Sequence, residues 1–87
     1  MVSEKVTVVN ERGIHMRFAN MFVAEMGKFD CDVTLLVNRN EIDAKSIMNI
    51  ISSCIRCGTE IEIQCDGADE NEALEKALDI ISSKFEE

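Results

Sequence analysis

The residue of this chain best suited to chemistry is His15, the only histidine among 87 residues. It follows Gly13 and Ile14, and an apolar helical pattern begins directly after it. Histidine is not a preferred helix cap, but the unpaired N–H groups and the dipole at a helix start attract anions. Two residues later, Arg17 offers a planar, permanently charged fork for phosphate oxygens. A nucleophilic imidazole, an anion-binding helix end and an arginine together predict a site that carries a phosphoryl group.

The overall composition predicts one small domain covering residues 1–87. Apolar residues make up 46% of the chain and charged residues 30%, as in ordinary globular proteins. Because no apolar run approaches about 18 residues, we expect no membrane-spanning segment. The first residues lack the basic and apolar regions of a secretory signal, so the expected location is the cytoplasm.

The charge of the chain argues against nucleic acid as a partner. Its 17 acidic and 9 basic residues give a net charge of −8, whereas affinity for nucleic acid requires clustered basic residues. The acidic residues concentrate late in the chain, while Arg12 and Arg17 lie around His15. The balance of charge near the histidine therefore differs from the average.

Four cysteines raise the question of metal or redox chemistry: Cys31, Cys54, Cys57 and Cys65. Cys54 and Cys57 form a C-x-x-C pair, but the chain has no second such pair and its histidine is distant, so a zinc site has little support. Without an export signal the thiols are expected to stay reduced, and Cys65 fits a core position. We expect inert thiols, no metal and no cofactor, with a thiol switch at Cys54 and Cys57 as a remote alternative.

Four elements are predicted in the first half of the chain. Residues 4–9 and 33–37 alternate apolar and polar side chains, the pattern of half-buried strands. Between them, residues 16–26 carry apolar side chains at helical spacing, and Gly27 is placed to end that helix. Residues 38–40 predict a hairpin turn into a brief third strand, 41–44.

The second half of the chain predicts two helices and one strand. Ser46 is a favoured N-cap for a short helix over about 47–53, which Gly58 is expected to end. Residues 60–66 alternate clearly and predict the fourth strand. Asp69 then caps the last helix, with Glu72 completing a pattern like a capping box, and the expected buried stripe is Leu74, Ala77, Leu78, Ile81 and Phe85.

The order β-α-β-β-α-β-α indicates an α+β fold, an open-faced sandwich with a four-stranded sheet. The longer helices cover one face, and the first β-α-β unit leaves a gap for another strand. The other face is expected to meet water with polar side chains: Lys5, Thr7, Glu60, Glu62 and Gln64.

Three segments resemble motifs of the HPr family, the histidine-containing phosphocarriers of the bacterial phosphoenolpyruvate-dependent sugar phosphotransferase system. Gly13–Ala19 is similar to the active-site motif, Lys45–Met48 to the regulatory-serine motif, and Gly67–Leu74 to the start of the last helix. They lie in the family's order and cover nearly the whole chain. The resemblance implies an antiparallel sheet with strand order 1-4-2-3.

The resemblance also implies a carrier rather than an enzyme with its own turnover. His15 would accept a phosphoryl group at Nδ1 from enzyme I and pass it to a IIA component. The reaction needs a neutral imidazole, which is the main form at cell pH. Arg17 and backbone N–H groups would stabilise the phosphoryl oxygens as charge redistributes.

Ser46 has two interpretations. As a helix cap it needs no further function. The resemblance implies that it is a regulatory site for a dedicated HPr kinase. A phosphoserine there would add nearly two negative charges at a helix N-terminus, beside the docking surface for enzyme I.

The short second helix cannot bury all of its apolar residues, so some of them must be exposed, and exposed apolar patches usually mark partner sites. The resemblance implies a docking surface for enzyme I, IIA domains and the kinase, on a chain that we expect to be monomeric. Its expected residues are Met16, Phe18, Asn20, Ile47, Met48 and Ile51.

Two positions depart from the family pattern, which usually has a small residue at Met16 and a proline at Phe18. These departures leave room for rival functions. One is a Crh-type regulatory module that acts through phosphorylated Ser46 on a transcriptional regulator, although chains of that type lack the active histidine. Another is a phosphocarrier for a regulatory or non-sugar relay.

Overall fold

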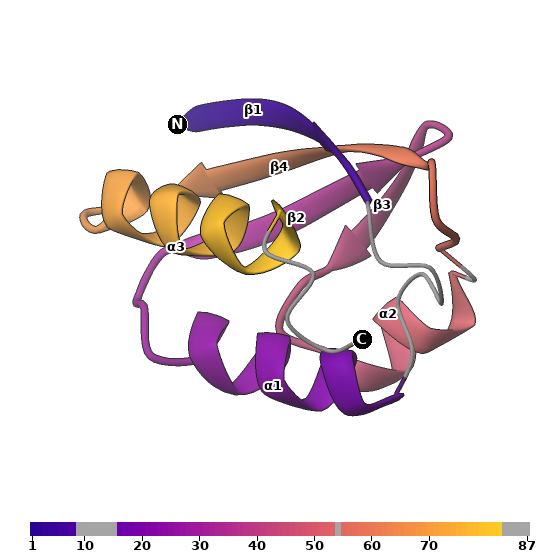
Figure 1. Ribbon diagram of the computed structural model, residues 1–87. Helices are drawn as coiled ribbons and strands as arrows, with labels where there is room; N and C mark the ends of the chain where they lie inside the picture. Colours follow the sequence, from indigo (N-terminus) through magenta and orange to yellow (C-terminus); the bar gives the residue numbers. More distant parts are fainter. Residues whose placement is uncertain (9–15, 54, 83–87) are drawn as a thin grey trace.

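A computed structural model describes residues 1–8, 16–53 and 55–82 of the chain (Figure 1). The seven elements follow the expected order: β1 (Val2–Thr7), α1 (Met16–Met26), β2 (Asp32–Val37), β3 (Asn40–Asp43), α2 (Ile47–Ser52), β4 (Glu60–Asp66) and α3 (Glu70–Ser82). The four strands form one antiparallel sheet in the order β1-β4-β2-β3. The α+β class and the strand order are therefore confirmed, and β4 fills the gap between β1 and β2.

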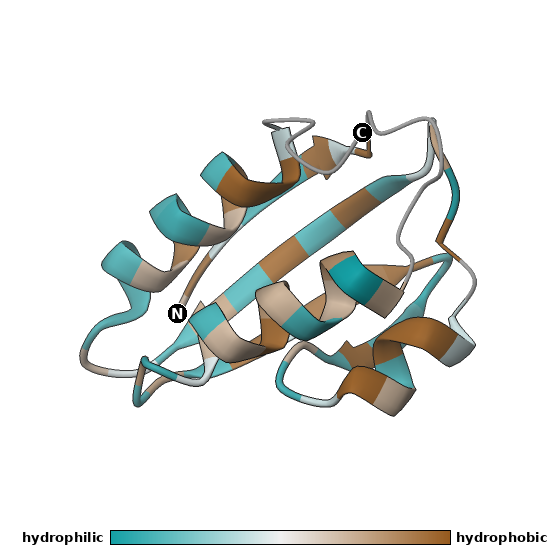
Figure 2. Ribbon diagram, turned by 60° about the horizontal axis from the view of Figure 1, so that its bottom comes forward, coloured by the Kyte–Doolittle hydropathy of each residue, from teal (hydrophilic) through white to brown (hydrophobic). Residues whose placement is uncertain are grey.

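The two faces of the sheet differ as the alternating sequence predicts. The helices lie on one side of the sheet (Figure 1), where Ile61, Ile63 and Cys65 of β4 are buried. On the open side Lys5 is in register with Glu62 and Thr7 with Glu60. Figure 2 shows the resulting alternation of hydrophilic and hydrophobic residues along the strands.

The core lies between the sheet and the helices. Phe18, Ala19, Phe22 and Met26 of α1 are almost fully buried, and the rings of Phe18 and Phe22 stack with their centroids 5.7 Å apart. On α3 the fully buried residues are Ala73, Ala77, Ile80 and Ile81. Leu74 and Leu78 are only partly buried, so the buried stripe of α3 is rotated relative to the prediction, and Phe85 lies outside the described residues.

Several predicted strand bounds need correction. The first strand spans Val2–Thr7 rather than 4–9, the second begins at Asp32 rather than residue 33, and the third spans Asn40–Asp43 rather than 41–44. The hairpin before it turns through Asn38 and Arg39 alone, whose φ angles are 51° and 72°.

The prediction that Gly58 ends the second helix is wrong, because α2 already ends at Ser52. Gly58 instead adopts a left-handed φ of +89°, and its N–H donates to the Val8 carbonyl oxygen at 2.8 Å. Gly27 does follow α1 directly, and its N–H donates to the Val23 carbonyl at 2.8 Å.

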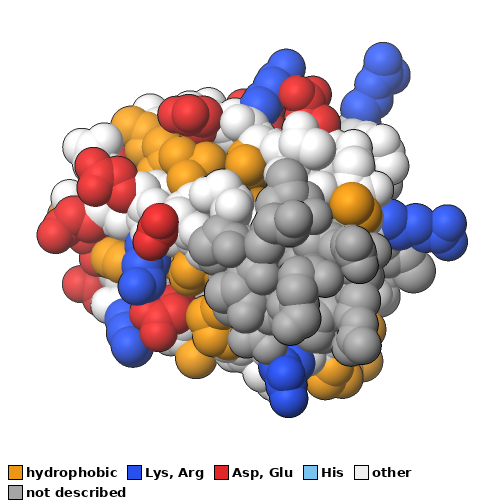
Figure 3. Space-filling view, in the orientation of Figure 1, with side chains coloured by type: hydrophobic (Ala, Val, Ile, Leu, Met, Phe, Trp, Pro, Cys, Tyr) orange, Lys and Arg blue, Asp and Glu red, His pale blue; other side chains and the backbone are white. Residues whose placement is uncertain are grey.

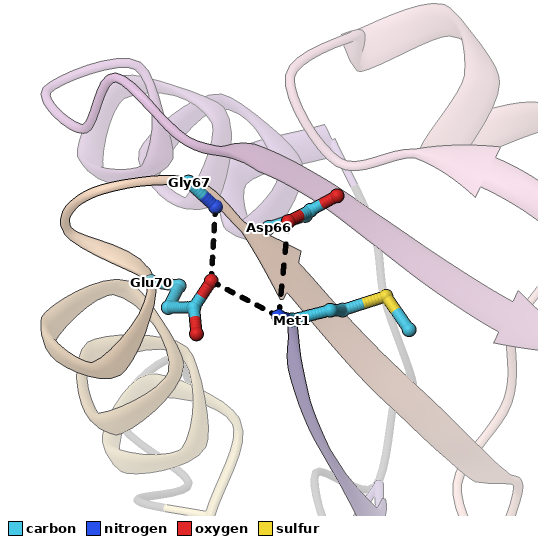
Figure 4. A network of polar contacts seen from close by, with 4 residues as sticks. All are labelled: Met1, Asp66, Gly67 and Glu70. Carbon is cyan, nitrogen blue, oxygen red and sulfur yellow. Dashed lines mark hydrogen bonds and ion pairs between the residues drawn. The ribbon is translucent and has the colours of Figure 1, made fainter.

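The start of α3 connects three parts of the fold. Glu70 Oε1 accepts the Gly67 N–H at 3.0 Å and lies 3.3 Å from the Met1 ammonium, which is also 3.8 Å from Asp66 Oδ1 (Figure 4). Asp69 precedes the helix as expected, but its carboxylate accepts the N–H groups of Asp30, at 2.8 Å, and Cys31, at 2.9 Å. The predicted cap residue thus fixes the connection between α1 and β2.

Candidate functional site

The predicted acceptor, His15, lies outside the described residues, so the site is described from the residue after it. Met16 is the first residue of α1 and is 53% exposed. Arg17 and Asn20 are exposed on the same helix. Of the residues that share the active-site motif with His15, Met16 and Arg17 therefore reach the surface.

The structure contradicts one expected docking residue. Phe18 is only 1% exposed, because its ring stacks on Phe22 inside the core. The resemblance to the family placed Phe18 in the docking surface, but its ring is buried here. Phe18 contributes packing and offers no area to a partner.

The exposed part of α2 lies beside α1. Met48 is 72% exposed, Ile47 and Ile51 are half-buried, and Ile50 is buried. The two helices pack against each other, as Figure 2 shows. We use the name α1–α2 surface for the residues Met16, Asn20, Ile47, Met48 and Ile51.

The charges of the chain are distributed unequally between its helices. Residues of α2 carry no charge, and α1 has no acidic residue in its first turn. On α3, by contrast, Glu72, Glu75 and Asp79 are exposed, and acidic side chains gather on that side of the molecule (Figure 3). Neither α2 nor the first turn of α1 therefore contributes an acidic side chain to the α1–α2 surface.

Ser46 caps α2 in the way its sequence predicts. Its backbone is extended, with φ −120° and ψ 114°, and its Oγ accepts the backbone N–H of Asn49 at 3.3 Å. The Asn49 carboxamide Nδ2 donates to the same Oγ at 3.2 Å. Sequence reasoning missed Asn49, although a polar residue three positions after a cap is placed to contact it.

Lys45 and Asp69 make long-range contacts that position the segments beside the site, and the sequence does not indicate these contacts. Lys45 Nζ donates to the Phe29 carbonyl oxygen at 2.7 Å. Asp69 holds Asp30 and Cys31 in the same connection, and the Asp30 N–H donated to its carboxylate holds the pKa of Asp69 below its usual value. No local pattern indicates these contacts, since their partners are 16 and 38 or more residues away.

Two of the cysteines are buried core residues. Cys31 and Cys65 are nearly inaccessible, and burial raises the pKa of Cys31 to about 12 and also raises that of Cys65. Since the thiolate is the reactive form of cysteine, burial and the raised pKa make these two thiols weak nucleophiles at neutral pH. Cys57 is exposed, whereas Cys54 lies outside the described residues.

Within the described ranges no group of three or more His, Cys, Asp or Glu side chains is placed to hold a metal ion. Among the same residues, none of the helices has both the length and the apolar character needed to cross a membrane.

Comparison with known proteins gives one consistent result. The family model described as "PTS HPr component phosphorylation site" matches residues 2–83. The phosphocarrier protein HPr of Treponema pallidum is 36% identical over 87 residues, which cover 100% of this chain and 99% of that one.

Solved structures agree with the sequence match. HPr-C-His from Thermoanaerobacter tengcongensis superposes with a TM-score of 0.94 at 33% identity, covering 100% of this chain and 98% of that chain. Crh from Bacillus subtilis, described as a swapped, intertwined dimer, gives a TM-score of 0.78 at 38% identity over 97% of each chain.

Proposed function

The chain belongs to the HPr family of phosphocarrier proteins, and from this premise we propose that it carries a phosphoryl group on His15. It accepts the group from enzyme I and passes it to IIA components. The observation that carries the proposal is the match to a phosphorylation-site family over residues 2–83, a range that contains the only histidine of the chain.

In this proposal the imidazole acts as a nucleophile and then as a leaving group. A bond forms between His15 Nδ1 and phosphorus while the bond from phosphorus to enzyme I breaks; in the second transfer the bond from phosphorus to Nδ1 breaks as phosphorus bonds to the IIA component. A neutral imidazole provides the lone pair. Arg17, exposed in the first turn of α1, supplies permanent positive charge for the phosphoryl oxygens.

The α1–α2 surface is the proposed docking site for enzyme I and the IIA components. It combines exposed apolar side chains, above all Met48, with a lack of acidic residues on α2. Exposed apolar patches of this kind usually mark partner sites. Both partners would use the same surface, because the same histidine must face each of them in turn.

The test begins with phosphoenolpyruvate and enzyme I. We expect one acid-labile phosphate per chain, which transfers onward to a IIA component and is missing in His15→Ala. Met48→Glu should slow the transfer from enzyme I, while Ser3→Glu, an exposed position of β1 in register with the neutral Gln64, serves as a control of equal charge. A phosphate that is acid-stable, or that persists in His15→Ala, would refute the proposed acceptor.

We further propose that Ser46 is a regulatory phosphorylation site for an HPr kinase. Its hydroxyl lies at the start of α2, next to Ile47 and Met48 of the α1–α2 surface. New negative charge there would weaken docking of enzyme I. Ser46→Asp should therefore slow phosphorylation of His15 by enzyme I, and equal rates for the two proteins would reject this role.

The alternative is a Crh-type module that acts through phosphorylated Ser46 on a transcriptional regulator. The 38% identity to Crh favours keeping it as a second candidate, while the presence of His15 favours the carrier. We propose a monomer in the cytoplasm. Phosphorylation by enzyme I separates the two functions, since a chain that enzyme I does not phosphorylate would indicate the module, and sedimentation tests the monomer.

A further inference from the structure

The turn that carries Ser46 is tied to a distant part of the chain by Lys45. The Lys45 ammonium donates to the Phe29 carbonyl oxygen at 2.7 Å, and the residue is half-buried. Phe29 lies between α1 and β2, 16 residues earlier in the chain. The contact therefore joins the start of α2 to the end of α1.

Other hydrogen bonds of this turn define its local shape. The Lys45 N–H donates to Asp43 Oδ1 at 2.9 Å, and the Ser46 N–H donates to the Asp43 carbonyl oxygen at 3.1 Å. Ala44 is fully buried and its N–H donates to the Val33 carbonyl at 3.1 Å. These contacts anchor the turn to the sheet, and the Lys45 side chain anchors it to the helical layer.

Lys45 and Ser46 have different hydrogen-bond partners. Lys45 Nζ donates to the Phe29 carbonyl oxygen, whereas Ser46 Oγ accepts the Asn49 N–H. The backbone of Ser46 between them is extended, with φ −120° and ψ 114°. The ammonium is therefore already bound to a carbonyl on another part of the chain.

The far end of the tether is itself fixed. The two residues after Phe29 donate their N–H groups to the carboxylate of Asp69 at 2.8 and 2.9 Å. The peptide unit that contains the Phe29 carbonyl is therefore hydrogen-bonded, through the Asp30 N–H, to Asp69 at the start of α3. A lysine that binds this carbonyl therefore ties the Ser46 turn to a connection that is itself hydrogen-bonded to Asp69.

We propose that Lys45 is a positioning residue for the phosphorylation of Ser46, an inference that rests on the regulatory role proposed above. By restraining the turn before a kinase binds, it lowers the conformational entropy lost on binding. Its cation does not contact the transferred phosphate. This distinguishes it from an electrostatic partner of the phosphoserine, which is the other role that a lysine next to this serine suggests.

The test compares wild type, Lys45→Met and Lys45→Arg as substrates of an HPr kinase with ATP. Lys45→Met should raise KM about tenfold with little change in kcat, because the unrestrained turn loses more conformational entropy when the kinase binds it. Lys45→Arg, which keeps a donor, should restore most of the loss. The matched control is Lys28→Met, since Lys28 is a surface lysine paired with Glu25 and its replacement removes the same charge.

A second measurement separates positioning from direct pairing. The pKa of the phosphoserine, followed by ³¹P NMR, should be the same in wild type and Lys45→Met, because no ammonium faces the phosphate. Phosphorylation of His15 by enzyme I should also stay unchanged and reports that the variant is folded. Lys45→Gln replaces Lys45→Met if the methionine variant does not fold.

The outcomes separate the two proposals. A wild-type chain that the kinase does not modify refutes the role of Ser46 and, with it, that of Lys45. A wild-type KM in the methionine or glutamine variant refutes Lys45 alone. A phosphoserine pKa that rises in that variant also refutes positioning, because it indicates direct pairing.

Discussion

Truncating Phe18 should destabilise the protein without removing a docking contact. The side chain is 1% exposed, and replacing such a phenylalanine by alanine costs about 3–5 kcal/mol. A chain of 87 residues at about 0.05–0.15 kcal/mol per residue has a total stability of roughly 4–13 kcal/mol. Phe18→Ala therefore removes a large share of it. Phe18→Leu keeps most of the volume but loses the stacked pair with Phe22, for a cost of about 1–2 kcal/mol.

The matched comparison is Met16→Ala, at the exposed start of the same helix. Its 53% exposed side chain predicts a change in stability within about 0.5 kcal/mol, but a slower transfer from enzyme I. Urea unfolding followed by circular dichroism measures the stabilities. Initial rates of phosphorylation by enzyme I are then compared for Met16→Ala and Phe18→Leu at a temperature where both are folded.

Phe18→Leu should match the wild-type phosphorylation rate within about twofold once it is fully folded, because its ring makes no contact with a partner. The reasoning fails if Phe18→Leu keeps wild-type stability and yet slows phosphorylation as much as Met16→Ala does. That pattern would place the ring at the interface with enzyme I.

Substitutions at three other residues test local features of the fold. Ser46→Ala removes the Oγ that accepts the Asn49 N–H and should lower the stability by about 1 kcal/mol, as thermal unfolding would measure. Ser46→Asp should keep most of the capping contribution. An equal loss of stability in the two variants would contradict a capping role. Hydrogen bonding from the Asp30 N–H lowers the pKa of Asp69 in the folded state, so its contribution to stability is present above the unfolded-state pKa and is lost as pH falls through the folded-state pKa. Asp69→Asn should therefore have a lower free energy of unfolding than wild type at neutral pH, and the difference should shrink in strong acid. Urea unfolding between pH 2 and 7 measures both proteins. A difference in unfolding free energy that does not change with pH would contradict this role of Asp69. Arg39 has a φ of 72°, which costs a residue with a Cβ about 1 kcal/mol, so Arg39→Gly should raise the melting temperature, and a lower one would count against strain at this turn.

The elements with clear two-sided patterns were predictable from the sequence. The bounds of β4 match the prediction because strict alternation from Glu60 to Asp66 satisfies a strand with one buried and one open face. The bounds of α1 match because its apolar residues return every three or four positions. Strand order came from the resemblance to a family rather than from either pattern.

Errors arose where several arrangements satisfy the same pattern. On α3, apolar residues cover more than one face, so periodicity alone could not select Ala73 and Ile80 over Leu74 and Leu78 as the buried residues. The packing partners, β1 and β4, decide the rotation. For Phe18, the resemblance to the family implied a docking role, but a large apolar ring gains more by burial than by contact with water.

Local rules fail most clearly at residues whose partners are far away in the sequence. Asp69 satisfies every local criterion for a helix cap, yet its carboxylate accepts hydrogen bonds from residues 38 and 39 positions earlier. In the motif Lys45–Met48 the sequence assigns a role only to Ser46, yet the Lys45 ammonium donates to the Phe29 carbonyl just after α1. Both contacts converge on residues 29–31, so this connection joins the starts of α2 and α3 to the end of α1. Because α1 begins directly after His15, the helix that carries the proposed site is held at its far end by two residues whose roles only the folded chain reveals.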